Sequence, residues 1–141
     1  MQAKTPTTQV QPYLFFDGRC EQALDFYKRA LAAKDIEIKR FKENPQSAMN
    51  PPASSEKVMH ASFRIGDTTL LASDGDCHGK PSFQGFSLTL TAPNIPEAER
   101  LFAALSDGGK VQMPMTQTFF SPRFGMVADR FGVSWMVIVA K

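Results

Sequence analysis

An internal repeat is the feature that most constrains what this chain can fold into. Gln11-Pro-Tyr-Leu-Phe-Phe aligns with Gly85-Phe-Ser-Leu-Thr-Leu, and the same offset lays Leu31 on Leu105 at two expected helix ends. Both halves show the same order of elements, a strand, a helix and three more strands. We therefore expect an α+β fold, in which two βαβββ modules form a cupped, partly open mixed β-sheet barrel with helices packed outside.

Length and termini indicate one domain. The 141 residues suit a single hydrophobic core. We expect residues 1–9 to be a flexible N-terminal tail and residues 10–141 a single domain, with module 1 at about 10–74 and module 2 at about 86–140. The start lacks the apolar stretch of a signal peptide, and no apolar run reaches membrane-spanning length. With only two cysteines, a reduced, cytoplasmic setting is expected rather than a disulfide.

Composition limits the classes of partner. The net charge is +2 and charged residues make up 21% of the chain, which lacks the basic excess of a nucleic-acid binder. Twelve Phe stand against two Tyr and one Trp. We expect no nucleic-acid partner and no membrane, but an apolar, aromatic-lined interior that suits a small molecule.

Hydrophobic periodicity predicts the individual elements. The first module should contain a helix at 20–32 and strands at 10–16, 35–41, 58–65 and 68–74. The second should contain a helix at 95–105 and strands at 86–91, 110–115, 125–129 and 134–140. Two loops, 42–57 and 75–84, separate these groups.

Strand alternation sorts side chains between the helices and a cavity. Expected beneath the helices are Pro12, Leu14, Phe16, Phe86, Leu88, Leu90, Trp135, Val137 and Val139. Expected on the cavity side are Gln11, Tyr13, Phe15, Leu70, Ala72, Asp74, Gly85, Ser87, Thr89, Ser134, Met136 and Ile138.

The duplicated order, with Asp129-Arg-Phe-Gly before the last strand, resembles the vicinal-oxygen-chelate superfamily of glyoxalase I, extradiol dioxygenases and bleomycin- and fosfomycin-resistance proteins. Gln11-Pro-Tyr-Leu-Phe-Phe-Asp-Gly, Val58-Met-His-Ala, Arg64-Ile-Gly-Asp and Phe124-Gly-Met-Val-Ala-Asp-Arg-Phe-Gly-Val-Ser-Trp look like its PhnB-like branch. That branch is often labelled a demethylubiquinone-methyltransferase-like domain.

The resemblance implies four metal-ligand positions, which fall on Gln11, Leu70, Gly85 and Met136. A divalent transition ion needs His, Asp, Glu or Cys donors, and this set offers only one amide and one thioether. We therefore expect no metal at the usual site and no cofactor. The chain also has no Gly-rich strand-to-helix turn to cradle an adenosyl cofactor, which argues against the methyltransferase label.

Three residues are candidates for acid–base catalysis, each with an alternative structural role. Asp74 is either a carboxylate base or a cap for the following loop, and Tyr13 either orients a ligand or fills space. His60 faces the helices if the Gly66-Asp67 turn has a two-residue loop, and a change of one residue turns it into the cavity. Asp76, Cys77 and His78 form a loop cluster that we interpret as surface.

The candidate ligand-binding residues are Gln11, Tyr13, Phe15, Ser87, Thr89, Phe119, Phe120, Arg123 and Met136. Phe119 and Phe120, with Met49 in the long loop, either pack on the body or form a lid. Arg123 either meets an anionic ligand or is solvated or ion-paired.

Three functions remain open. One is a binding protein that holds an apolar or aromatic ligand in the cup without the usual divalent metal. The second is a metal-independent enzyme that uses acid–base chemistry in the same cup, and the third a structural or regulatory dimer without ligand. The resemblance also implies a homodimer, in which the cup can be completed across the interface.

Overall fold

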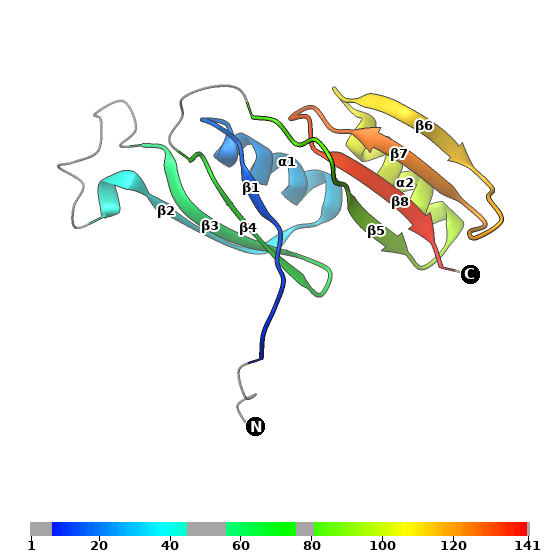
Figure 1. The fold of residues 1–141 in the computed structure, drawn as a ribbon, viewed down its shortest axis with the longest axis horizontal. Helices are drawn as coiled ribbons and strands as arrows, with labels where there is room; N and C mark the ends of the chain where they lie inside the picture. The colour runs from blue at the N-terminus through cyan, green and yellow to red at the C-terminus, as the bar shows by residue number, and fades with distance from the viewer. Residues whose placement is uncertain (1–6, 45–55, 76–80, 141) are drawn as a thin grey trace.

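The computed structural model describes residues 7–44, 56–75 and 81–140 (Figure 1). The first module contains β1 (Tyr13–Phe15), α1 (Cys20–Leu31), β2 (Lys34–Arg40), the short 3-10 helix η1 (Phe41–Glu43), β3 (Val58–Ile65) and β4 (Thr68–Ser73). The second module contains β5 (Leu88–Ala92), α2 (Ile95–Ser106), β6 (Lys110–Thr116), β7 (Phe124–Ala128) and β8 (Ser134–Val139). The predicted pair of βαβββ modules is confirmed.

Each module forms its own four-stranded sheet. The strand orders are β1-β4-β3-β2 and β5-β8-β7-β6. The first strand of each module pairs in parallel with the last, and the other pairs are antiparallel, so both sheets are mixed as predicted. The two sheets lie side by side and are not joined into one closed barrel (Figure 1).

The two helices form for recognisable local reasons. Apolar residues recur at helical spacing in α1 and bury one face, and the helix ends where Ala32 adopts a left-handed conformation at φ +54°. At the start of α2 the Asn94 side chain accepts a hydrogen bond from the Glu97 N–H, and Pro96 lies in the first turn. In the described part of the chain, no helix has the length and apolar character needed to cross a membrane.

Both modules contribute to one hydrophobic core. α1 and α2 touch each other, and α2 also packs against the strands of its own sheet (Figure 1). The Tyr27 ring of α1 lies 5.6 Å from the Trp135 ring of β8. Phe131, in the β7–β8 turn, lies 6.0 Å from the Phe16 ring and 5.8 Å from the Phe26 ring. These aromatic contacts join the two repeats through their helical sides.

A buried carboxylate lies at the same junction. Asp129 accepts hydrogen bonds from the Tyr27 hydroxyl at 2.6 Å and from the Trp135 indole N–H at 2.9 Å. Its other oxygen accepts from the backbone N–H groups of Phe131 and Val133. Burial and, secondly, the Asp129 charge raise the pKa of Tyr27 well above its ordinary value. The Asp-x-x-Gly turn therefore fixes the second module to the helix of the first.

The face of each sheet turned away from the helices is called the open face here. Leu14 and Phe16 are buried on the helical side, as predicted, and Tyr13 and Phe15 are exposed on the open face. In β8, Trp135 and its alternate residues Val137 and Val139 are buried, which confirms the assignment for that strand. Met136 and Ile138 are half-buried on the open face, the side predicted for them.

The face predicted for β4 is wrong. Ala72 pairs with Leu14 and is buried on the helical side, and Leu70 is only 4% exposed on that same side. Met136 pairs with Thr89, whose repeat equivalent Phe15 pairs with Ser73. The counterpart of Met136 is therefore Ser73, not Leu70. When two repeats are aligned with an error of an odd number of residues, every side chain of the strand is assigned to the opposite face, which explains the error.

The expected packing of His60 against the helices is also wrong. The hairpin does have the two-residue Gly66-Asp67 loop, since Ile65 pairs with Thr68. Nevertheless His60 is exposed, and its ring lies 6.0 Å from the ring of Tyr13 on the open face. The predicted loop length is therefore correct. The predicted face of His60 is wrong because it was deduced from the wrong face assigned to β4.

Candidate functional site

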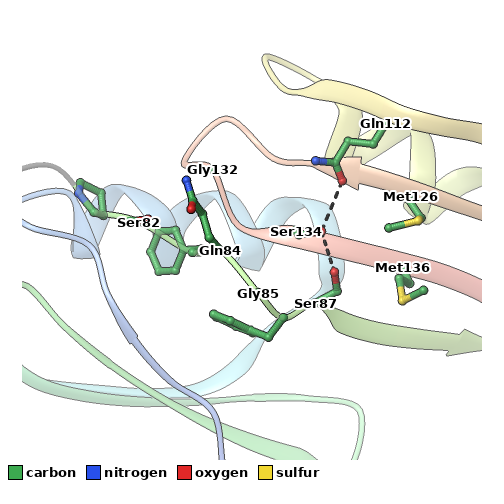
Figure 2. Close-up of a pocket in the computed structure, with 12 residues that line it drawn as sticks. Ser82, Gln84, Gly85, Ser87, Gln112, Met126, Gly132, Ser134 and Met136 are labelled. Carbon is green, nitrogen blue, oxygen red and sulfur yellow. Dashed lines mark hydrogen bonds between the residues drawn. The ribbon is translucent and has the colours of Figure 1, made fainter.

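The open face of the second module contains a hollow with a volume of about 930 Å³ (Figure 2). Its lining residues among those described are Pro81, Ser82, Phe83, Gln84, Gly85, Phe86, Ser87, Gln112, Met126, Gly132, Ser134 and Met136. They come from the segment before β5 and from β6, β7, the β7–β8 turn and β8. We call this space the open-face hollow.

Two of the predicted ligand-binding residues lie in the hollow, and a third adjoins it. Ser87 and Met136 line it. The Thr89 hydroxyl lies next to them, 3.8 Å from the Met136 sulfur. Thr89 also lines a smaller apolar crevice between the modules, with Leu70, Leu88 and neighbouring residues. The sequence thus located one wall of the hollow.

Polar side chains form a connected chain along the hollow. The Ser87 and Ser134 hydroxyl oxygens are 2.7 Å apart, and the Ser134 hydroxyl donates to the Gln112 side-chain carbonyl at 3.3 Å (Figure 2). Alternation had placed Ser134 on this face. Gln112 was missed, because it is the extra residue of an irregular step between the pairs Val111–Val127 and Met113–Met126. Such a bulge leaves no reliable signal in the sequence.

Aromatic residues of the segment before β5 form another wall. Phe86 was predicted to lie beneath the second helix, but β5 begins only at Leu88. Phe86 is instead 48% exposed and lines the hollow with Phe83. The strand alternation used for the prediction does not apply outside the strand, which explains this error.

The first module presents a separate aromatic group. Tyr13 lies 4.8 Å from Phe15 and 6.0 Å from His60, measured between ring centroids. Gln11 donates a hydrogen bond from its side chain to the Thr69 carbonyl. None of these four is among the described residues that line the open-face hollow. The structure therefore brings Tyr13 and His60 together, but not with Ser87 and Met136.

Asp74 lies away from the open face as an anchor for the start of α1. Its side chain is 2% exposed, and one oxygen accepts from the N–H groups of Gly18 at 2.7 Å and Cys20 at 2.8 Å. Its other oxygen accepts from the Val58 N–H at 2.8 Å. Burial and, secondly, the Asp74 charge raise the pKa of the Cys20 thiol far above its ordinary value. These bonds correspond to a structural role rather than to a cavity-side base.

The candidates of the β6–β7 loop lie elsewhere. Phe119 is 89% exposed, and Phe120 packs edge-on against Phe124 at 5.2 Å. The Arg123 guanidinium donates to a Glu99 carboxylate oxygen at 2.8 Å, so Arg123 is ion-paired. None of the three predicted loop residues is found among the described lining of the hollow. Met49, Asp76, Cys77 and His78 lie outside the described residues.

The residues at the superfamily's metal positions do not suit a divalent ion. Correcting Leu70 to Ser73 gives an amide, a buried hydroxyl, a glycine and a thioether at Gln11, Ser73, Gly85 and Met136. Hard or borderline divalent ions need charged or imidazole donors to offset dehydration. Within residues 7–44, 56–75 and 81–140, no group of three or more His, Cys, Asp or Glu is placed to hold a metal.

The fold of this chain, two mixed sheets built from a repeated βαβββ unit, is also found in a known class of proteins. A solved structure from Sphaerobacter thermophilus DSM 20745, described as a member of the glyoxalase/bleomycin resistance protein/dioxygenase superfamily, shares this fold. Its TM-score is 0.57 at 16% identity, covering 94% of this chain and 98% of that chain. This likeness shows that the chain shares its fold with a member of that superfamily.

Within this class, the chain belongs to the 3-demethylubiquinone-9 3-methyltransferase family, whose model matches residues 8–138. It is similar to protein PA1353 from Pseudomonas aeruginosa, at 39% identity and a TM-score of 0.83, covering 95% of this chain and 98% of that chain. A putative 3-demethylubiquinone-9 3-methyltransferase, PhnB protein, from Bacillus cereus matches at 27% identity and a TM-score of 0.79, covering 94% and 100%. The predicted PhnB-like branch is confirmed.

Proposed function

We propose that this protein binds a small apolar or aromatic molecule in the open-face hollow, without the superfamily's usual divalent metal. The observation that carries the proposal is the composition of the hollow. Its walls combine two aromatic rings, Phe83 and Phe86, with two thioethers, Met126 and Met136. Thioethers adapt to irregular apolar shapes, and the serine and glutamine side chains of the same lining supply the polar groups that orient a ligand.

The family description names a methyltransferase, and we do not extend that activity to this chain. The sequence has no Gly-rich strand-to-helix turn for an adenosyl cofactor. A ligand in the hollow would contact hydroxyls, two side-chain amides, thioethers and aromatic rings, which suit recognition rather than group transfer.

The binding proposal is tested by filling the hollow. Ser134→Phe introduces a bulky ring at a residue that lines the hollow, whereas Ala103→Phe adds the same ring to the exposed side of α2. A thermal-shift screen of small aromatic compounds should raise the melting temperature of the unchanged protein and of Ala103→Phe, because ligands that bind the native state stabilise it. Ser134→Phe should lose the shift. Equal shifts in all three proteins would contradict the proposal.

Metal independence is tested separately. The corrected donor set at the superfamily's ligand positions supports it, because neither glycine nor thioether replaces an imidazole or carboxylate. Elemental analysis of the purified protein should find no stoichiometric divalent metal. A ratio near one metal per chain would overturn this part of the proposal.

We further propose a homodimer whose second copy covers the open faces. Exposed aromatic residues support it, since Tyr13, Phe15 and Phe86 present apolar rings that a single chain leaves uncovered. Light scattering should give twice the chain mass of 15.6 kDa. A species at the single-chain mass across the working concentrations would contradict the dimer.

A second candidate function is acid–base catalysis at Tyr13 and His60. The observation in its favour is the edge-on contact of these two rings on the open face. Histidine is the side chain that enzymes use most often as a general acid or base. If the protein turns over a bound compound, His60→Gln should abolish turnover while the thermal shift persists. Full turnover in His60→Gln would exclude this site.

A further inference from the structure

The hydrogen-bond chain in the open-face hollow has a fixed direction. The Ser134 hydroxyl carries one hydrogen and donates it to the Gln112 carbonyl oxygen at 3.3 Å. The 2.7 Å contact between Ser87 and Ser134 therefore uses the hydrogen of Ser87, with the Ser134 oxygen as acceptor. The hydroxyl hydrogens of both serines are therefore directed along this series of hydrogen bonds toward the Gln112 side chain.

This direction determines which atom of Gln112 is left for a ligand. Its carbonyl oxygen is occupied by Ser134, so the amide nitrogen with its two N–H donors lies on the other side of the side chain. Figure 2 shows this nitrogen pointing toward the turn that contains Gly132, another residue of the hollow. In the described part of the chain, no acceptor for this nitrogen is found.

The surroundings restrict the charge of the ligand. The described lining residues carry no charged side chain. A carboxylate that enters such a site loses water without gaining a counter-charge, whereas a neutral oxygen acceptor needs only a hydrogen bond. The rings of Phe83 and Phe86 and the sulfurs of Met126 and Met136 suit a flat apolar body.

We infer that Gln112 is a specificity residue, whose side-chain N–H donates to a carbonyl oxygen on a neutral aromatic ligand. This inference rests on the proposed function, the binding of a small molecule in the hollow. Ser87 and Ser134 position Gln112, because they fix which end of its amide faces the ligand. The class of ligand is therefore a neutral aromatic ketone or a compound with an equivalent acceptor.

Three probes of similar shape test this class by fluorescence titration or calorimetry. 2-Acetonaphthone carries a neutral carbonyl, 2-ethylnaphthalene lacks an acceptor, and 2-naphthoate carries a charge. A neutral hydrogen bond corresponds to roughly a fivefold difference in affinity, so the ketone should bind about fivefold more tightly than the hydrocarbon. The carboxylate should bind most weakly. Equal affinities of the ketone and the hydrocarbon would overturn the inference.

Matched variants assign the effect to the amide. Gln112→Glu keeps the side-chain length but replaces the NH2 group with a second acceptor oxygen, so both N–H donors are lost. It should abolish the preference for the ketone while hydrocarbon binding stays within about twofold. Gln117→Glu adds the same charge at an exposed position that does not line the hollow, and should keep the preference. An unchanged preference in Gln112→Glu, or an equal loss in Gln117→Glu, would overturn the role of Gln112.

The two proposals fail in different ways. If none of the three probes binds the unchanged protein, the proposed binding function fails, and this inference with it. If the probes bind, lose affinity in Ser134→Phe and show no preference for the ketone, only the role of Gln112 fails. Thermal unfolding of each variant verifies that it is folded.

Discussion

At the scale of single residues, two buried carboxylates join separate parts of the fold. Asp74 and Asp129 are each no more than 3% exposed, and each accepts hydrogen bonds from more than one element. The sequence identified Asp74 as a base or a cap. It could not decide, because the N–H groups of Gly18, Cys20 and Val58 reach this carboxylate only through long-range folding.

Tyr27→Phe should lower the free energy of unfolding by about 1–3 kcal/mol, because it removes one donor to the buried Asp129 carboxylate. Urea denaturation measures the difference. Tyr13→Phe is the matched control, since Tyr13 is the other tyrosine of the chain and is exposed. Equal losses in the two variants would contradict the role assigned to Asp129.

Stability should fall at alkaline pH because of Cys20. Burial raises the pKa of its thiol in the folded state above the ordinary value of 9.0, so only the unfolded chain releases this proton just above pH 9. The stabilisation is complete below that value and is lost as the pH rises, at a limiting slope of about 1.4 kcal/mol per pH unit. Urea titrations between pH 8 and 10 measure the slope. In Cys20→Ala the slope should be reduced, and an unchanged slope would contradict this origin.

At the scale of elements, the type and order of helices and strands followed from periodicity, whereas strand faces depended on exact register. The predicted helix at 20–32 differs from α1 by one residue, because apolar spacing marks helices well. In β4 an offset error reversed Leu70 and Ala72, and with them the side predicted for His60. The bulge at Gln112 could not be predicted for the same reason, because register is a property of two paired strands and not of one segment of sequence.

The Asn94 side chain that caps the start of α2 should contribute to the stability of the fold. Asn94→Ala should destabilise the protein by about 1 kcal/mol, because the Glu97 N–H loses its acceptor at the start of the helix. Asn94→Asp keeps an acceptor oxygen in the same place and should retain most of the stability. Thermal unfolding followed by circular dichroism compares the two variants. A loss of the same size in Asn94→Asp would show that the side-chain cap is not the cause.

At the scale of the whole molecule, the modules share a core even though their sheets are separate. The aromatic contacts of Phe131 with Phe16, Phe26 and Tyr27 all cross from one repeat to the other. The helical sides of both repeats could be predicted from alternation, apart from β4. Their mutual packing could not, because no periodic pattern within one repeat encodes contacts with the other.

Phe131→Ala should destabilise both modules together, by about 3–5 kcal/mol, because a buried ring at their junction is removed. Phe119→Ala, at an exposed position, should change the stability by less than about 0.5 kcal/mol. Trp135 fluorescence, which reports on the second module, and circular dichroism should give one coincident transition. Separate transitions in the unchanged protein would show that the repeats unfold independently.

The bulge in β6 has a consequence for how ligand choice can diverge among proteins of this design. β6 is the edge strand of its sheet, so a change in its length disturbs the pairing with β7 alone. Deleting one residue there would withdraw Gln112 from the hollow and leave the other lining residues in place. Relatives that share those other residues can therefore differ in what they recognise through a single insertion or deletion in an edge strand.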